Sequence, residues 1–246
     1  MLIHGKLGTR ELALAVTFTA LYVVFGVVKF SPIIGLPGQA ITAAAIFAPI
    51  IGTLFGPYIG VLSAGLGGII GISVGYFSLL SFAAGVVAAL LSGAVSRGRR
   101  MVSVIVYLLI FLLLAFYPVI GPAWLYPPYL WFQIVGFIIL ISPLQSIAIK
   151  ELKSNSDSRL LYAFFVTSLT STLAGQIAGS VTYEVIIYPD IKGATGTWLA
   201  TALLYPMERV IIAIGSAMIG TTLFKILKNT NFVSFFNNVN REENCS

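Results

Sequence analysis

The sequence predicts an all-α fold, a polytopic transmembrane helical bundle of about six to eight spanning helices with both termini in the cytoplasm. Three observations predict it. The composition is strongly apolar, apolar stretches recur along the chain, and basic residues gather at alternate gaps between them. Hydrophobic residues make up 58% of the 246 residues and charged residues only 9%. A soluble domain carries far more charge on its surface, so soluble classes of protein are excluded.

Eight apolar stretches give the expected helices in order. They are residues 11–28, 41–55, 57–74, 77–95, 101–120, 129–149, 160–185 and 205–227. Each approaches the ~20 residues that a helix needs to cross the hydrocarbon core, although the second and third are short. We expect residues 1–228 to form one transmembrane helical domain. Residues 229–246, which are rich in asparagine, are expected to form a polar, flexible tail.

The positions of lysine and arginine set the expected orientation. With the N-terminus inside, the inner segments hold eleven of the fourteen basic residues. These are Lys6, Arg10, Arg97, Arg99, Arg100, Lys150, Lys153, Arg159, Lys225, Lys228 and Arg241. The outer loops hold only Lys29 and Lys192, and Arg209 lies within the last stretch. This positive-inside bias predicts a multi-pass protein of the cell membrane. It also accounts for the formal charge of +6 by contact with lipid headgroups, so no nucleic-acid partner is expected.

The few histidine and cysteine residues argue against a metal site and against a Cys–His catalytic pair. The single histidine, His4, and the single cysteine, Cys245, lie at opposite ends of the chain. A metal site or a Cys–His catalytic pair needs its ligands brought together within the fold. We therefore expect no catalytic residues, no metal and no cofactor, and the protein is predicted not to be an enzyme.

The first stretch and the loop after it contain many small or turn-forming residues. Ala13 and Thr17 lie four residues apart, as do Ala15 and Thr19, and such spacing lets another helix approach closely. The loop at residues 31–39 holds two prolines and two glycines, which predicts an ordered outer turn.

The third stretch shows the strongest internal pattern. Small residues recur at steps of four, four, four, three and four. They are Gly56, Gly60, Ala64, Gly68, Gly71 and Gly75. A stripe almost without side chains suits close contact with another helix or with a ligand, and helix contact is the simpler interpretation.

The polar residues of the last two stretches are the best candidates for a site. On stretch seven, Thr172, Gly175, Gln176, Gly179 and Tyr183 share one helical face, with Ser180 and Glu184 in the adjoining row. Ionisable groups inside a membrane call for a functional reason. Pro206 suggests that the last helix begins near Tyr205, so that Glu208 and Arg209 occupy its first turn. Arg209 then needs an anionic partner, and Glu184 is the nearest candidate in depth.

These residues outline an expected small-molecule cavity near the outer side. The substrate-binding candidates are Gln39, Tyr76, Gln176, Tyr183, Glu184, Trp198, Glu208 and Arg209. Polar groups that converge in an apolar pocket are the usual form of such a site. Glu208 with Arg209 suits a zwitterionic or amide-bearing ligand, and Trp198 with Tyr183 suits a planar ring.

The chain resembles the substrate-capture subunits, or S-components, of energy-coupling-factor transporters. The similar features are the small residues of the first helix, the Pro/Gly outer loop, the joint Leu54-Phe-Gly-Pro-Tyr58 with the glycines after it, and a last helix opening at Pro206-Met-Glu-Arg209. The resemblance implies a helical membrane protein that binds a vitamin-like micronutrient. It also implies a separate membrane coupling subunit and two ATPases as partners. The chain carries no GxxxxGK[ST] phosphate loop of its own.

The resemblance also assigns a partner interface on the first helix. The family meets its coupling subunit through an Ala-xxx-Ala motif, and the matching spacings here are Ala13 with Thr17 and Ala15 with Thr19. Two other functions stay open. One is an assembly or channel subunit of a surface apparatus. The other is a membrane enzyme acting on lipid or a lipid-linked substrate, with Glu184 or Glu208 as its acid or base.

Overall fold

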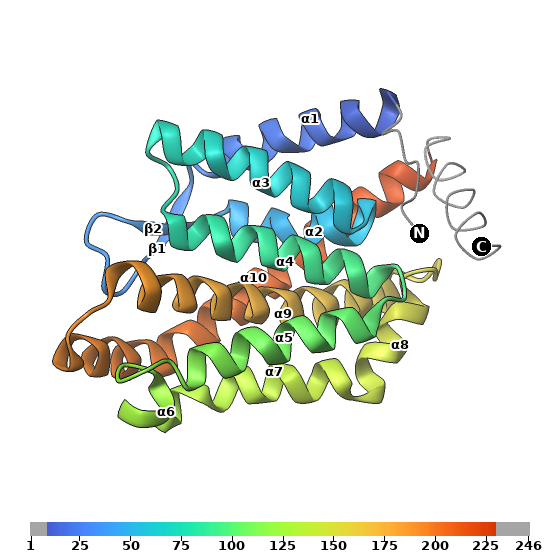
Figure 1. The fold of residues 1–246 in the computed structure, drawn as a ribbon. Coiled ribbons are helices and arrows are strands. Elements are labelled where there is room, and N and C mark those ends of the chain that lie inside the picture. The colour runs from blue at the N-terminus through green and yellow to red at the C-terminus, as the bar shows by residue number, and fades with distance from the viewer. Residues whose placement is uncertain (1–8, 230–246) are drawn as a thin grey trace, which may run out of the picture.

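The computed structural model describes residues 9–229, with side chains placed from residue 12 to residue 228. This part of the chain is a helical bundle with one short β-hairpin, which confirms the all-α prediction (Figure 1). Almost all of the tail predicted at residues 229–246 lies outside the described residues, as do His4 and Cys245.

Most helices fall within the predicted stretches, but the stretch 129–149 is divided into several elements and the last helix begins well before residue 205. The long and short helices are α1 (Thr9–Phe25), α2 (Ala44–Phe55), α3 (Pro57–Val74), α4 (Leu79–Ser96), α5 (Arg100–Ala115), α6 (Pro122–Leu125), α7 (Trp131–Ile141), α8 (Pro143–Glu151), α9 (Asp157–Thr182) and α10 (Ile191–Asn229). A 3₁₀ turn, η1 (Pro127–Leu130), precedes α7, and a π-helical turn, η2 (Tyr183–Ile187), extends α9. Strands β1 (Lys29–Pro32) and β2 (Ala40–Thr42) form an antiparallel pair between α1 and α2. The all-α prediction omitted this pair.

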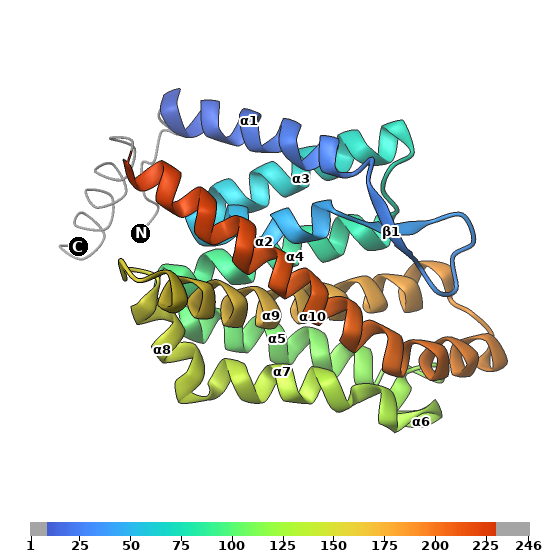
Figure 2. The same ribbon diagram turned by 180° about the vertical axis from the view of Figure 1, so that it is seen from behind.

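Helix α9 lies at the centre of the bundle. Of its apolar window, 83% is buried, against 39% for α3 and 33% for α10. Helices α1 and α3 lie on one side of the bundle, α5 and α7 lie on the other, and α10 crosses behind α9 (Figures 1 and 2). Residues of α4 belong to both hydrophobic clusters, so α4 joins the two sides.

Within residues 9–229, four helices are long and apolar enough to cross a membrane. They are α3, α4, α9 with η2, and α10. The pair η1–α7 and α8 gives a fifth if the two bent segments, which meet at 62°, form one span. The described part of the chain holds three further apolar helices, in α1, α2 and α5, and these are shorter. The predicted count of six to eight spans therefore stays a prediction.

An arginine side chain of α5 stabilises the bend between α7 and α8. Ser142 and Pro143 interrupt the helix, and carbonyl groups left open there must find donors, because lipid supplies none. Arg100 donates to the carbonyl oxygens of Leu140 at 2.8 Å and Ser142 at 2.9 Å. The bend is thus a satisfied part of the fold.

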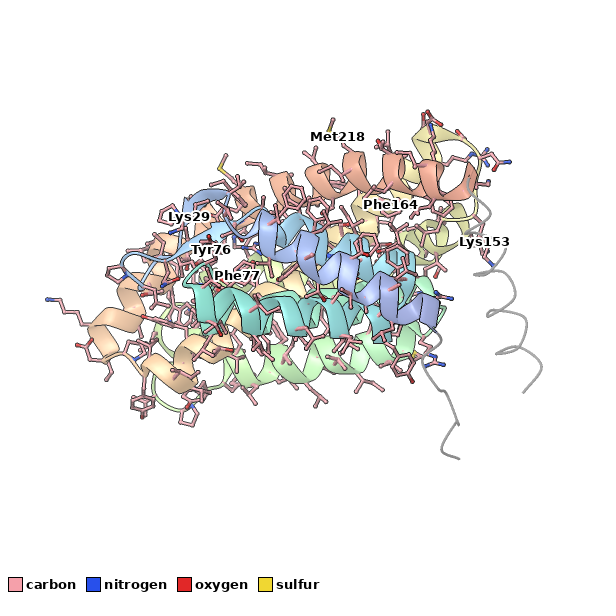
Figure 3. The ribbon with its side chains drawn as sticks, turned by 90° about the horizontal axis from the view of Figure 1, so that it is seen from above. Lys29, Tyr76, Phe77, Lys153, Phe164 and Met218 are labelled. Carbon is pink, nitrogen blue, oxygen red and sulfur yellow. The ribbon has the colours of Figure 1, made fainter. Side chains whose placement is uncertain are left out.

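Basic side chains gather at one end of the bundle. The turns α4–α5 and α8–α9 and the end of α10 lie there, beside the start of α1 (Figure 1). Figure 3 places Lys153 at this end and Lys29, with Tyr76 and Phe77, toward the other. This arrangement is the one that the positive-inside rule requires, and the cytoplasmic placement of the termini remains its prediction.

Glycines pack α2, α3 and α4 together at backbone distance. A Cβ atom on Gly52 would lie 2.1 Å from Oγ of Ser92 and 2.2 Å from the carbonyl oxygen of Ala89, and one on Gly60 would lie 2.9 Å from Cα of Gly52. One on Gly71 would lie 2.0 Å from the ring of Phe77. The glycine stripe of α3 therefore serves contact within the protein, as its simpler interpretation predicted.

Candidate functional site

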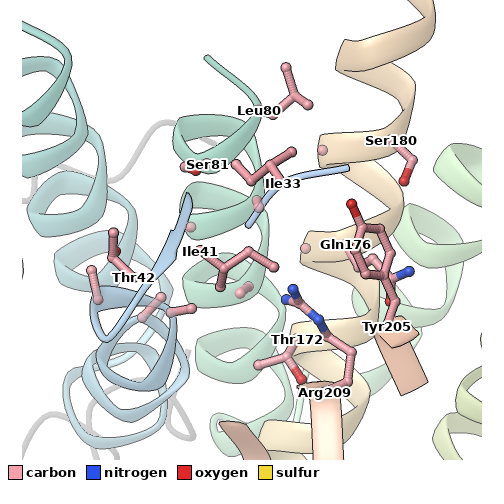
Figure 4. Close-up of a pocket in the computed structure, with 18 of the residues that line it drawn as sticks. Ile33, Ile41, Thr42, Leu80, Ser81, Thr172, Gln176, Ser180, Tyr205 and Arg209 are labelled. Atoms are coloured by element: carbon pink, nitrogen blue, oxygen red, sulfur yellow. The ribbon is translucent and has the colours of Figure 1, made fainter. Parts of the chain in front are cut away.

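A cavity of about 90 Å³ lies toward the end of the bundle opposite the basic end. Its walls come from the β1–β2 hairpin, α2, α4, α9 and α10, with Tyr22 of α1 and Phe77 of the α3–α4 turn (Figure 4). The lining is mostly apolar and aromatic with a few polar groups, which is the usual composition of a small-molecule site. Its volume leaves room for several water molecules or a small organic ligand.

The hairpin forms one wall of the cavity, and the sequence predicted no strand there. Ile33 and Ile34 line the cavity from the connection between the strands, and Ile41 and Thr42 line it from β2. The connection turns at two glycines in the left-handed region, Gly35 and Gly38, with φ of 84° and 82°. The predicted turn at residues 31–39 is therefore present. The turn is flanked by two strands, and β2 carries Ile41 into the site.

The opposite wall is where α9 packs on α4. A Cβ atom on Gly175 would lie 2.5 Å from the carbonyl oxygen of Ala84, and one on Gly179 would lie 3.2 Å from that of Leu80. The small residues of α4 that line the cavity are Ser81, Ala84, Gly85 and Ala88. Their spacing of three, one and three is a helical face, and that pattern is the sequence signal that would have placed α4 at the site.

Arg209 enters the cavity from the middle of α10. Because α10 begins at Ile191, the prediction that Glu208 and Arg209 occupy a first helical turn is wrong. Pro206 lies inside the helix and cannot donate to the carbonyl group of Ala202. The indole Nε1 of Trp131 donates to that oxygen at 3.1 Å, so the proline is accommodated without ending the helix.

The anionic neighbour of Arg209 is Glu208, not the predicted Glu184. A guanidinium nitrogen of Arg209 lies 3.9 Å from Oε2 of Glu208, which is an ion pair but not a hydrogen bond. Both side chains are buried, with 6% and 5% of the residue exposed. The hydroxyl of Ser31 on the hairpin donates to Oε1 of Glu208. Glu208 therefore connects the hairpin to α10 beside the cavity.

Most polar groups around the cavity already have partners. The hydroxyls of Tyr183 and Thr197 are 3.0 Å apart, and those of Ser180 and Tyr129 are also 3.0 Å apart. The indole of Trp198 donates to the carbonyl oxygen of Ile120 at 2.9 Å. These contacts fix the wall and leave little hydrogen-bonding capacity for a ligand.

Two lining residues keep unused polar groups. The amide nitrogen of Gln176 donates to the hydroxyl of Tyr129 at 3.3 Å, while Oε1 has no partner. Nε of Arg209 also has no partner. Figure 4 shows the guanidinium of Arg209 pointing between Ile41 of the hairpin and Gln176 of α9. Buried polar groups are nearly always satisfied, so these two are the groups to which a ligand would bind.

Glu184 is fully buried and neither of its carboxyl oxygens has a partner. It lies in the π-helical turn η2, directly after Tyr183, and does not line the cavity. π-helical turns inside longer helices are frequent at functional sites. Like Gln176 and Arg209, Glu184 is therefore a buried polar residue whose presence the packing alone does not explain.

The structure brings half of the predicted binding residues to the cavity. Gln176, Tyr183, Trp198 and Arg209 line it, whereas Gln39, Tyr76, Glu184 and Glu208 do not. Gln39 lies in the hairpin connection, half-buried, and accepts through its carbonyl group from Ile33. The turn after Gly75 directs Phe77 rather than Tyr76 into the site, where its ring packs on Tyr22 with centroids 5.3 Å apart. The lining residues that the sequence reasoning did not assign come mainly from the hairpin and α4.

The predicted partner residues of α1 separate into two faces. Ala15 and Thr19 are buried against α3, where Ser63 donates to the carbonyl oxygen of Ala15 at 3.2 Å. Ala13 and Thr17 lie on the exposed face of the helix. Only the second pair is accessible to another protein in this conformation.

The site can bind and orient a small molecule through one cation, one amide and aromatic walls. Within residues 9–229, no three His, Cys, Asp or Glu side chains come together in a way that could hold a metal ion. No protein-family model, no curated protein and no solved structure matches the chain.

Proposed function

We propose that this chain is the membrane-embedded substrate-capture subunit of an uptake transporter, which binds a vitamin-like small molecule in the cavity. The observation that carries the proposal is the pair of unused polar groups, on Arg209 and Gln176, in an apolar cavity. Stability alone would favour an apolar side chain over a buried, incompletely paired arginine. A ligand that supplies the missing partners gives such an arginine a reason to be there.

The position of the cavity supports uptake from outside. Every lining element reaches the cavity near the hairpin end, and the basic turns lie at the opposite end (Figures 1 and 3). With the basic end in the cytoplasm, the cavity lies near the outer surface, with the hairpin on its outer side. A capture subunit needs this one-sided placement, because its ligand enters from outside and leaves only after the coupling machinery acts.

The partners in this proposal follow from the resemblance to S-components. A membrane coupling subunit and two ATPases would supply the energy, because the sequence holds no phosphate-binding loop. Ala13 and Thr17 on the exposed face of α1 are the positions that a coupling subunit could contact. We place the protein in the cell membrane, as the charge pattern indicates.

The proposal is tested by native mass spectrometry of the detergent-purified full chain, in search of a co-purified small molecule. The blocking variant is Ala84→Leu, which replaces a methyl group on the cavity wall by an isobutyl group. The matched control is Gly65→Ala on α3, because a Cβ atom there would meet nothing within 4 Å. We expect an adduct in the wild type and in Gly65→Ala, and its loss in Ala84→Leu.

Two outcomes would contradict a capture subunit. If no small molecule accompanies the wild-type chain from several expression hosts, the assembly-subunit alternative gains. If an adduct appears but turns into a new mass during incubation of the purified chain, the protein is an enzyme. Loss of that turnover in Glu184→Gln would then identify the acid or base.

A further inference from the structure

Arg209 is the only charged residue among the described residues that line the cavity. Its guanidinium carries five N–H donors in a planar fork, a geometry that matches a carboxylate. Its ion pair with Glu208, at 3.9 Å, is about 1 Å longer than a charge-assisted hydrogen bond. The donors that face the cavity are therefore left for another acceptor.

The charge around Arg209 limits what that acceptor can be. Glu208 is the next residue on α10, and Ser31 holds it from the hairpin side. A doubly charged phosphate would place two more negative charges beside this carboxylate, with no second cation in the lining to balance them. Glu208 already offsets part of the charge of Arg209, so one further negative charge is the most that this apolar surrounding accommodates.

The other lining residues and the cavity volume indicate the polarity and size of the rest of the ligand. Ile33, Ile41, Leu80 and Phe77 enclose apolar space, and the free amide oxygen of Gln176 can accept one hydrogen bond. The volume of about 90 Å³ is below the ~300–1,000 Å³ of sites for drug-sized ligands. The occupant of this conformation is therefore small.

We propose that the cavity binds a small organic monoanion, a carboxylate whose oxygens accept from Arg209 while its apolar remainder lies against the hairpin and α4. This rests on the proposed function and names the chemical class of its ligand. It replaces the zwitterionic or amide-bearing ligand expected from the sequence, because Glu208 does not line the cavity beside Arg209.

Isosteric acid–amide pairs test the proposal on the full chain in detergent. The probes are propionate against propionamide, and benzoate against benzamide, followed by thermal unfolding and by titration calorimetry. We expect at least one acid to raise the unfolding midpoint and its amide to leave it unchanged. In Arg209→Gln the Kd for that acid should rise about tenfold to a hundredfold, as expected for a lost hydrogen bond to a charged group.

Two further variants separate binding from folding. Arg209→Lys keeps the charge without the planar fork, so its loss of acid binding should be smaller than that of Arg209→Gln. The double variant Glu208→Gln/Arg209→Gln removes both charges and leaves no buried carboxylate without its cation. It should unfold cooperatively and still fail to bind the acid.

Three results would overturn the monoanion. Amides that bind as tightly as their acids, acid binding that survives Arg209→Gln, or failure of both acids up to about 10 mM would each do so. The co-purified adduct gives an independent check, because a carboxylic acid gains one methyl group on esterification and a phospholipid is recognised by its mass. A non-acidic or phospholipid adduct that Ala84→Leu removes would leave a capture subunit standing and refute the acid. If no adduct is found but the acid binds, the carboxylate site would stand and the capture subunit would be refuted.

Discussion

Two regions of the described bundle are packed through glycines, but only one of them contains a cavity. Between α2, α3 and α4, Gly52 and Gly60 let backbones touch, and a Cβ atom would collide with backbone on the facing helix. Between α4 and α9, Gly175 and Gly179 give the same close approach. There, however, the hairpin and α10 do not fill the space beside the two helices, and a cavity with unpaired polar groups remains. Small residues thus make a site only where a third element does not close the gap.

The glycine region should be the more sensitive of the two to shape. In Gly52→Ala the new methyl group would meet Oγ of Ser92 and the carbonyl oxygen of Ala89. The backbone cannot withdraw as a flexible side chain can, so we expect a loss of about 3 kcal/mol in the free energy of unfolding. The measurement is the midpoint of heating followed by size-exclusion chromatography.

Gly65→Ala is the control for that experiment, because it adds the same methyl group to α3 in open space. Its midpoint should equal or slightly exceed that of the wild type, since alanine favours a helix by up to about 1 kcal/mol over glycine. Equal losses in the two variants would show that helix propensity, and not close packing, sets the glycine content of this region.

In the cavity region, we expect the loss of a hydrogen-bonding group to reduce stability more than a small change in side-chain size does. Ser31→Ala removes the hydroxyl that donates to Glu208 and leaves a buried, ion-paired carboxylate short of a partner. The expected cost is about 2 kcal/mol, the size of a hydrogen bond to a charged group. Ser31→Thr keeps the hydroxyl and suits a strand, so its unfolding midpoint should stay near that of the wild type. Equal destabilisation in both variants would assign the loss to packing of the hairpin.

Gly35 and Gly38 offer a comparison inside the hairpin itself. Both have φ near +80°, so alanine at either position costs about 1–2 kcal/mol of backbone strain. A Cβ atom on Gly35 would also lie 3.0 Å from the ring of Tyr183, whereas one on Gly38 would meet nothing within 4 Å. We expect similar unfolding midpoints for the two variants, within about 1 kcal/mol, but weaker propionate or benzoate binding in Gly35→Ala alone. Equal binding in both would show that the ring of Tyr183 does not shape the site.

The sequence predicted the features that depend on local pattern. The bounds of α3 coincide with the apolar stretch 57–74, and the helical face predicted on stretch seven correctly grouped Gln176 of α9 with Tyr183 of η2 at the cavity. The features it missed depend on partners far away in the chain. Pro206 looked like a helix start because nothing near it shows that Trp131 satisfies the carbonyl group of Ala202. The hairpin strands are too short to give a clear alternating pattern, so residues 31–39 read as a loop and Ile41 and Thr42 as the start of a helix.

The smallest expected effect concerns the contact that lets α10 continue past Pro206 and deliver Arg209 to the cavity. Trp131→Phe removes the donor to Ala202 at a partly exposed site, and we expect a loss of about 0.5–1 kcal/mol. Trp124→Phe is the control, because Trp124 is 61% exposed. In a Pro206→Ala background the helix supplies its own donor to Ala202, so Trp131→Phe should cost less there. A double-mutant cycle measures that coupling energy. If the two changes add without coupling, the indole does not compensate the proline, and the packing of α10 against η1 and α9 alone keeps the helix intact.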